Sequence, residues 1–135
     1  MYLFLDAADN SGKITVALFV AQDKKIKILK KISSKVLAED ILVLLDRILR
    51  QQKKLPTEIQ GIIVITGPGP YTALRVSLSI GNSLAYGLEI PIVGVGQEGN
   101  LEKMIKEGFK KLKRAKAGRY VTKFKMQKLK LKIKK

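Results

Sequence analysis

Residues 62–75 run Ile62-Ile63-Val64-Ile65-Thr66-Gly67-Pro68-Gly69-Pro70-Tyr71-Thr72-Ala73-Leu74-Arg75, and this stretch decides the fold. Four consecutive aliphatic residues bounded by Gly and Pro are typical of a strand that is covered on both faces, as in a parallel or mixed sheet. Pro68 and Pro70 cannot continue the strand. Alternating them with Gly67 and Gly69 predicts a stiff corner that leads directly into a helix.

The corner itself admits two interpretations, a phosphate-binding turn and a structural turn. A glycine-rich turn between a strand and a helix can bind phosphate, because its free N–H groups and the helix dipole both favour an anion. A P-loop would need Gly, Lys and Ser or Thr where this chain has Thr72, Ala73 and Leu74, and the two prolines remove two N–H donors. The sequence therefore favours a structural corner.

The remaining apolar segments predict an α/β order around this corner. Residues 2–6 and 14–21 predict two strands joined by a turn, and a third strand is expected from Lys25 to about Ile32. The elements expected after it are a helix over about 35–51, N-capped by Ser33 or Ser34, a helix over 71–88, a strand over 91–95 and a helix over about 99–113. Three strands in a meander followed by alternating strands and helices are the order of the actin-like, ribonuclease H-like fold. We therefore expect an α/β lobe with a mixed five-stranded sheet.

The composition restricts the chemistry that the chain can carry. A length of 135 residues suits one domain with a continuous core. The absence of Cys and His excludes thiol chemistry, disulfides, the usual zinc sites and His-based triads. No apolar run approaches the roughly 20 residues of a membrane span, and residues 1–6 lack the basic start of a signal peptide. We therefore expect a soluble cytoplasmic protein without a membrane contact.

The net charge of +16 is concentrated near the C-terminus. Residues 1–100 hold 12 Lys/Arg and 9 Asp/Glu, whereas residues 101–135 hold 15 and 2. Because the expected helices and strands end near residue 113, we divide the chain into an N-terminal lobe, residues 1–115, and a basic strand or tail, residues 116–135. A basic segment beside a nearly neutral domain points to nucleic acid, to an acidic partner or to a soluble tail.

The tail alternates lysine with apolar residues, with one phase slip at Gln127-Lys128. This pattern predicts an amphipathic strand with a bulge, with the lysines in a row on one side. The row consists of Lys123, Lys125, Lys128, Lys130 and Lys132. These lysines could follow an RNA backbone, or they could keep an exposed edge strand from aggregating. The first alternative would make the chain a small basic RNA-binding protein.

The first expected helix has a wider apolar arc than one contact with a sheet requires. The arc includes Leu42, Leu45 and Leu49 and spans roughly 160 degrees, against the roughly 100 degrees that a surface helix minimally buries. Two explanations remain open. The helix could be wedged between the sheet and a neighbouring helix, or it could also contact another chain.

The second expected helix, over residues 71–88, carries two contrasting stripes. Small residues repeat every four positions, which permits close packing on a sheet; they are Ala73, Ser77, Gly81 and Ala85. The opposite stripe is polar and consists of Thr72, Arg75, Ser79, Asn82 and Tyr86. This helix has no lysine in a chain with 22 of them. A lysine-free stripe with Arg and Tyr favours a protein interface over a plain solvent face.

Two segments of the chain resemble a known family. Residues 67–75 are similar to the Gly-Pro-Gly-Ser-Phe-Thr-Gly-Leu-Arg segment of the bacterial tRNA threonylcarbamoyladenosine biosynthesis protein TsaB, a non-catalytic relative of TsaD. The run Ile90-Pro91-Ile92-Val93-Gly94-Val95 is similar to the Pro-Leu-Val-Gly-Val strand of the same family. The resemblance covers about residues 1–115, whereas full-length relatives continue into a second lobe. It therefore implies a short, one-lobe version of the actin-like TsaB/TsaD family.

The resemblance also implies a function and partners. The chain would be a non-catalytic scaffold that supports a TsaD-like protein in making N6-threonylcarbamoyladenosine at position 37 of tRNA, without catalytic, metal or cofactor-binding residues of its own. A homodimer, a TsaE-like ATPase and tRNA are the further partners to consider. In TsaB the first two helices form the surfaces for self-association and for TsaD. The interface residues implied here are Leu42, Leu45, Leu49, Thr72, Arg75, Ser79, Asn82 and Tyr86.

Asp6 is the acid that stands where actin-like ATPases place a functional carboxylate, at the end of the first strand. Nucleotide-binding members follow this Asp with glycine and hydroxyl residues, whereas here Ala7 and Ala8 follow. The expected sheet segments offer no second carboxylate for a metal. Asp6 is therefore expected to cap the hairpin turn.

Overall fold

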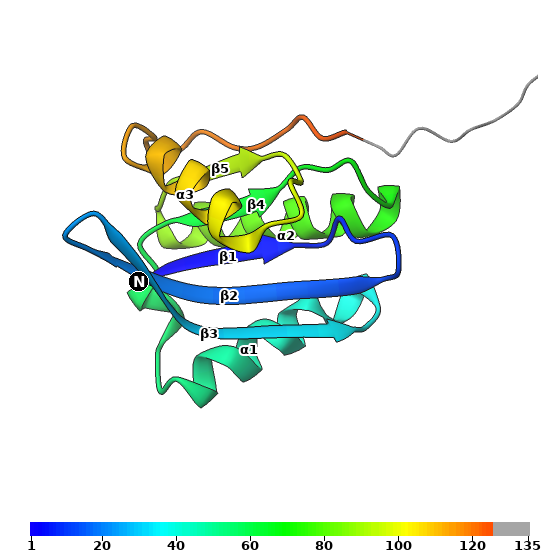
Figure 1. Cartoon of the computed structure of the whole chain (residues 1–135), viewed down its shortest axis with the longest axis horizontal. Helices are drawn as coiled ribbons and strands as arrows, with labels where there is room; N and C mark the ends of the chain where they lie inside the picture. The colour runs from blue at the N-terminus through cyan, green and yellow to red at the C-terminus, as the bar shows by residue number, and fades with distance from the viewer. Residues whose placement is uncertain (126–135) are drawn as a thin grey trace, which may run out of the picture.

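A mixed five-stranded sheet forms the centre of residues 1–125, the part of the chain that the computed structural model describes (Figure 1). The strands are β1 (Tyr2–Asp6), β2 (Lys13–Gln22), β3 (Lys25–Lys35), β4 (Ile62–Ile65) and β5 (Ile92–Val95). Their order in the sheet is β3-β2-β1-β4-β5. The first three strands pair antiparallel, whereas β1 with β4 and β4 with β5 pair parallel. The predicted α/β class and mixed five-stranded sheet are confirmed.

The helices cover both faces of this sheet (Figure 1). They are α1 (Ile41–Gln51), α2 (Tyr71–Leu88) and α3 (Leu101–Leu112), with short 3-10 turns η1 (Ala38–Asp40) and η2 (Pro56–Glu58). Side chains of β1 alternate between the two faces: Leu3 packs in the cluster with α1 and α2, and Phe4 packs in the cluster with α3. No helix within residues 1–125 is long and apolar enough to cross a membrane.

The first helix begins six residues later than the sequence predicts, so the expected cap at Ser33 or Ser34 is wrong. Both serines belong to β3, which pairs with β2 along its whole length as far as the Lys13 to Lys35 pair. The Ser33 hydroxyl lies 2.8 Å from the Thr15 hydroxyl across the two strands. Pairing with the long strand β2 therefore outweighs the preference of serine for helix caps. The helix proper starts only at Ile41.

The Gly-Pro corner packs tightly against the turn after β1. A Cβ atom at Gly69 would lie 2.6 Å from the carbonyl oxygen of Ala8, so only glycine fits there. Gly67 has a φ of +110°, which also favours glycine. Pro70 occupies the N-cap position of α2, and the helix starts at Tyr71 as the sequence predicts.

After α3 the chain returns along β5 and α2 (Figure 1, orange). The backbone N–H of Lys125 donates to the carbonyl of Thr66 at 2.7 Å. Val121 and Phe124 pack against the core clusters. Residues 119–125, hereafter the return segment, are therefore attached to the lobe. The bulge predicted at Gln127-Lys128 lies outside the described residues.

Close packing of α3 on β4 provides a test of the fold. A Cβ atom at Gly108 would lie 2.6 Å from Cδ1 of the buried Ile63, whereas a Cβ atom at Gly87 in α2 would meet nothing within 4 Å. Alanine is favoured over glycine in a helix by about 1 kcal/mol, and overpacking costs about 1–3 kcal/mol. We expect Gly108→Ala to lower the free energy of unfolding in urea by about 1–2 kcal/mol, and the control Gly87→Ala to raise it by about 0.5–1 kcal/mol. Equal stabilisation by both changes would contradict the close contact.

Candidate functional site

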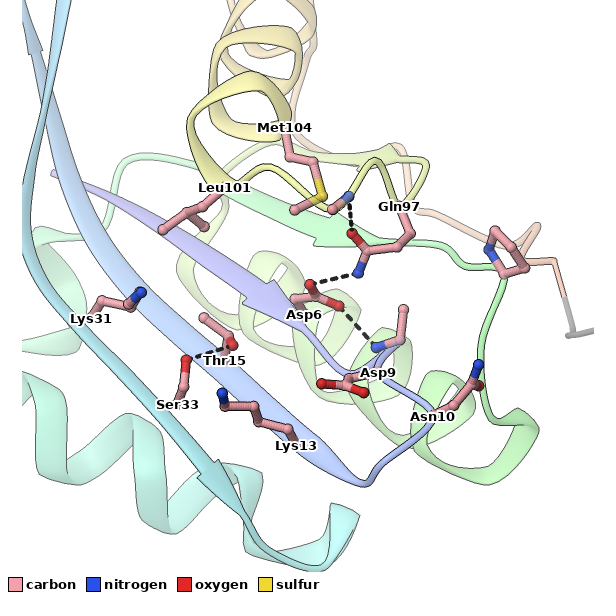
Figure 2. Close-up of a pocket in the computed structure, with 13 residues that line it drawn as sticks. Asp6, Asp9, Asn10, Lys13, Thr15, Lys31, Ser33, Gln97, Leu101 and Met104 are labelled. Atoms are coloured by element: carbon pink, nitrogen blue, oxygen red, sulfur yellow. Dashed lines mark hydrogen bonds between the residues drawn. The ribbon is translucent and has the colours of Figure 1, made fainter.

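A hollow of about 470 Å³ opens at the carboxyl end of β1. Figure 2 shows its walls, which come from the turn after β1, from β2 and β3, and from the loop that leads from β5 into α3. The carboxyl ends of β1, β4 and β5 meet at this edge of the sheet, where open α/β sheets commonly place their ligands.

Asp6 lies at the bottom of this hollow and is only 9% exposed. One carboxylate oxygen accepts the backbone N–H of Ala8 at 2.8 Å, and the other accepts the side-chain amide of Gln97 at 2.9 Å. The amide oxygen of Gln97 in turn accepts the N–H of Gly99. Asp6 therefore closes the turn after β1, as expected, and also ties it to the loop after β5. The sequence did not reveal Gln97, because 91 residues separate it from Asp6.

Cations and hydroxyl groups face Asp6 across the hollow (Figure 2). Lys13 and Thr15 come from β2, and Lys31 and Ser33 come from β3. Asp9 lines the hollow as well, so the lining holds two lysines and two carboxylates. No group of three or more His, Cys, Asp or Glu residues among residues 1–125 could hold a metal ion. The arrangement can hydrogen-bond a small polar molecule, but its buried carboxylate already has partners for both oxygens.

The predicted interface stripe on α2 is divided by the structure into two parts. Thr72, Arg75 and Ser79 are exposed, and together with Val76 and Ile80 they line a hollow of about 290 Å³. The Arg75 guanidinium lies 5.2 Å from the centre of the Tyr71 ring at the start of the helix. We call this part, from Thr72 to Ile80, the α2 face.

The other two residues of the stripe contact the return segment. The amide of Asn82 donates to the carbonyl of Val121 at 2.8 Å and accepts its N–H at 3.0 Å. The ring of Tyr86 lies 6.5 Å from the ring of Tyr120. Asn82 is therefore engaged within the chain, whereas Tyr86 keeps 73% of its surface exposed.

The structure corrects the predicted interface residues on α1. Leu45 and Leu49 are only 6% and 4% exposed and belong to the core, so neither is available to another chain, whereas Leu42 is 52% exposed. The physical reason is that one side of α1 packs on the sheet through Ile41, Leu44, Leu45, Ile48 and Leu49, at helical spacing. Val43 within α1 and Leu37 just before η1 are exposed as well.

The predicted lysine row is described only at its start. Lys123 and Lys125 lie in the return segment and are exposed. Lys128, Lys130 and Lys132 lie outside the described residues.

Sequence comparisons relate the chain to enzymes that modify tRNA. Residues 27–108 match the family described as TsaD, tRNA N6-adenosine threonylcarbamoyltransferase. The curated protein of that name from Geotalea daltonii is 40% identical over 68 residues, which cover 50% of this chain and 20% of that protein. The one from Syntrophotalea carbinolica is 38% identical over 68 residues, with the same coverage. The matched region therefore spans about a fifth of the length of these curated relatives.

Comparison of structures identifies the same fold in a solved protein. YeaZ from Pseudomonas aeruginosa superposes with a TM-score of 0.59 at 21% sequence identity, covering 70% of this chain and 44% of that chain. This likeness shows the fold, and the predicted actin-like, ribonuclease H-like lobe is confirmed.

The environment of Asp6 predicts an unusual pH dependence of stability. Burial raises the pKa of Asp6 above its ordinary value of 3.8, although the hydrogen bonds from Ala8 and Gln97 oppose the rise. The folded chain therefore holds this proton at pH values where the unfolded chain has released it. The contribution of Asp6 to stability consequently falls as pH rises from 3.8 through the folded pKa. As pH rises through this window, the free energy of unfolding of Asp6→Asn, measured in urea, should increase relative to that of the unmodified chain.

Asp9→Asn is the matched control for this measurement. The backbone N–H of Ser11 lowers the pKa of the exposed Asp9 carboxylate, so the stabilising effect of Asp9 is present above pH 3.8 and is lost as pH falls. The relative stability of Asp9→Asn should therefore decrease as pH rises. Parallel pH profiles for the two variants would contradict the assignment.

Proposed function

The chain belongs to the TsaB/TsaD family of tRNA threonylcarbamoyladenosine proteins, and from this premise we propose that it is a non-catalytic subunit that binds and supports a TsaD-like protein. Family membership was predicted from residues 67–75, which lie within the matched region, and is confirmed. In the proposed role the TsaD-like protein transfers the threonylcarbamoyl group to tRNA. A TsaE-like ATPase and a second copy of this chain are candidate further partners, and the role places the chain in the cytoplasm.

The observation that carries the proposal is the α2 face. Its hollow is lined by Thr72, Arg75 and Ser79 around the apolar Val76 and Ile80. The whole helix lacks lysine, although the chain has 22. Protein interfaces are depleted in lysine and enriched in arginine and in aromatic residues. A surface with this composition on a strongly basic protein supports contact with another protein.

Three exposed apolar residues adjoin η1, a turn that contacts α2. Leu37 precedes η1, and Leu42 and Val43 follow it in the first turn of α1; all three are exposed. Large exposed apolar patches with polar surroundings mark interaction sites. A partner bound to the α2 face could bury these three side chains as well.

The turn after β1 supports the non-catalytic part of the proposal. Both oxygens of Asp6 have hydrogen-bond partners within the chain. Ala7 and Ala8 follow it and are buried, so they supply neither a hydroxyl group nor an open backbone for phosphate. Gly69 of the Gly-Pro corner packs closely against the backbone of Ala8. We infer that catalysis is left to the partner.

A charge introduced into the α2 face tests the proposed interface. We expect Ser79→Glu to abolish capture of a TsaD-like protein, because burying the added carboxylate costs several kcal/mol of desolvation, which an ion pair with Arg75 one turn earlier would offset only in part. Thr57→Glu in η2 is the control, since it makes the same exchange of a hydroxyl for a carboxylate at another exposed position. Capture would be measured by pull-down and sedimentation. Undiminished capture by a folded Ser79→Glu variant would refute the interface, and loss of self-association alone would assign the α2 face to a homodimer.

The absence of catalysis is tested with nucleotide. We expect the purified chain neither to hydrolyse ATP nor to bind it appreciably in calorimetry, because the turn after β1 lacks phosphate ligands. Micromolar affinity that disappears in Asp6→Ala would contradict this expectation and would support an actin-like ATPase.

A further inference from the structure

A separate hollow of about 610 Å³ lies between the C-terminal end of α2 and the chain that follows α3. Tyr86 and Tyr120 line it from opposite segments, and small residues, among them Gly87 and Gly118, form much of the rest. Tyr86 is one of the predicted interface residues, but this hollow is separate from both the α2 face and the hollow at Asp6.

The two tyrosine side chains are exposed to solvent although their rings are neighbours. Tyr86 is 73% exposed and Tyr120 is 41% exposed, with their ring centres 6.5 Å apart and their planes inclined by 53°. This spacing is at the outer end of the range for aromatic pairs, so each ring keeps a free surface. Exposed rings beside a hollow are the usual platforms on which unpaired nucleic-acid bases stack.

The return segment holds Tyr120 in place without belonging to a helix or strand. Asn82 pairs with both the N–H and the carbonyl of Val121, the residue next to Tyr120. The side chain of Val121 packs over Gly94 of β5, where an added Cβ atom would lie 3.1 Å from Cγ1 of Val121. These contacts fix the backbone beside the ring. The backbone that carries the ring is therefore preorganised, which reduces the entropic cost of binding.

The segment that contributes Ala117, Gly118 and Tyr120 to the hollow is basic. Residues 108–125 hold eight Lys/Arg and no Asp/Glu. In the described part of the chain, only Lys111 of these eight forms an ion pair, with Glu107 at 3.9 Å. Lys116 and Arg119 flank the lining residues Ala117 and Gly118 and are exposed. Cations without carboxylate partners beside stacking platforms are the combination that binds single-stranded nucleic acid.

We propose that this hollow binds single-stranded RNA, with unpaired bases stacked on the free faces of Tyr86 and Tyr120 and the flanking phosphates held by Lys116 and Arg119. Glu89 is the one carboxylate in the lining. It can only accept hydrogen bonds at neutral pH, so it suits the amino edge of a base and repels phosphate. The backbone of the RNA therefore passes on the side of Lys116 and Arg119. This site belongs to the chain alone and does not depend on the proposed TsaD-like partner.

The test is a titration of a labelled single-stranded RNA of mixed sequence with the full chain, followed by fluorescence anisotropy at several salt concentrations. We expect Tyr86→Leu and Tyr120→Leu each to weaken binding about five- to hundredfold, because one stacked base is lost. Tyr86→Phe keeps the ring and should bind like the unmodified chain. Leu55→Ala is the control, because it removes an exposed apolar side chain that does not line the hollow, and it should leave affinity unchanged.

The salt dependence separates stacking from charge. The leucine variants should keep the logarithmic salt slope, whereas Arg119→Gln should reduce it by about 0.7, the value for one phosphate contact to a single strand. Equal affinity of folded leucine variants and the unmodified chain would overturn the proposal and assign RNA binding to the lysines alone. Equal affinity for duplex and single-stranded RNA would overturn it too. Tyrosine-dependent binding of a polyglutamate peptide in place of RNA would identify an acidic protein as the ligand.

Discussion

The contact between the Gly-Pro corner and the turn after β1 is the constraint on which the other features depend. Gly69 lies against the backbone of Ala8 so closely that no side chain fits. This contact fixes where β4 ends and where α2 begins, because the prolines stop the strand and Pro70 precedes the first helical turn. Asp6 and Gln97 join the same turn to the loop after β5. Packing and hydrogen bonds within the chain thereby hold together the loops around the hollow at the carboxyl end of the sheet. The surfaces proposed for partners lie on α2 instead.

The return segment divides the polar stripe of α2 into two parts. A helix of 18 residues carries one polar stripe, but Asn82 binds the backbone of Val121, so the stripe is interrupted there. On one side of the interruption lies the α2 face with Arg75 and Ser79. On the other side Tyr86 meets Tyr120. The two parts differ in chemistry, since the first has apolar residues in its hollow and the second is bordered by cations. One helix therefore carries two surfaces of different chemistry.

Much of this fold could be predicted because its signals are local. The buried strand β4, the prolines after it and the small-residue ridge of α2 are each encoded within a few residues. The predictions that were wrong concern residues whose conformation or burial depends on contacts with distant parts of the chain. Ser33 and Ser34 are good helix caps in isolation, but pairing with β2 keeps them in a strand. Leu45 and Leu49 belong to a wide apolar arc in the sequence, and only the packing of α1 on the sheet shows that they are buried while Leu42 is not. Gln97 and the clamp of Asn82 on Val121 join residues far apart in the chain, so no local pattern could reveal them.

The positions of the two proposed surfaces on α2 have a consequence for how they would work together. Ser79 and Tyr86 are seven residues apart, which is about 10 Å along a helix axis. A protein bound at the α2 face would therefore lie directly beside an RNA strand held at the tyrosines. Lys116 and Arg119 would neutralise phosphates between the two ligands. Without these cations, a protein bound at the α2 face would have to desolvate phosphates that keep their full charge. The lobe would in this way act as a scaffold: it would hold RNA beside a catalytic partner without contributing a reacting group.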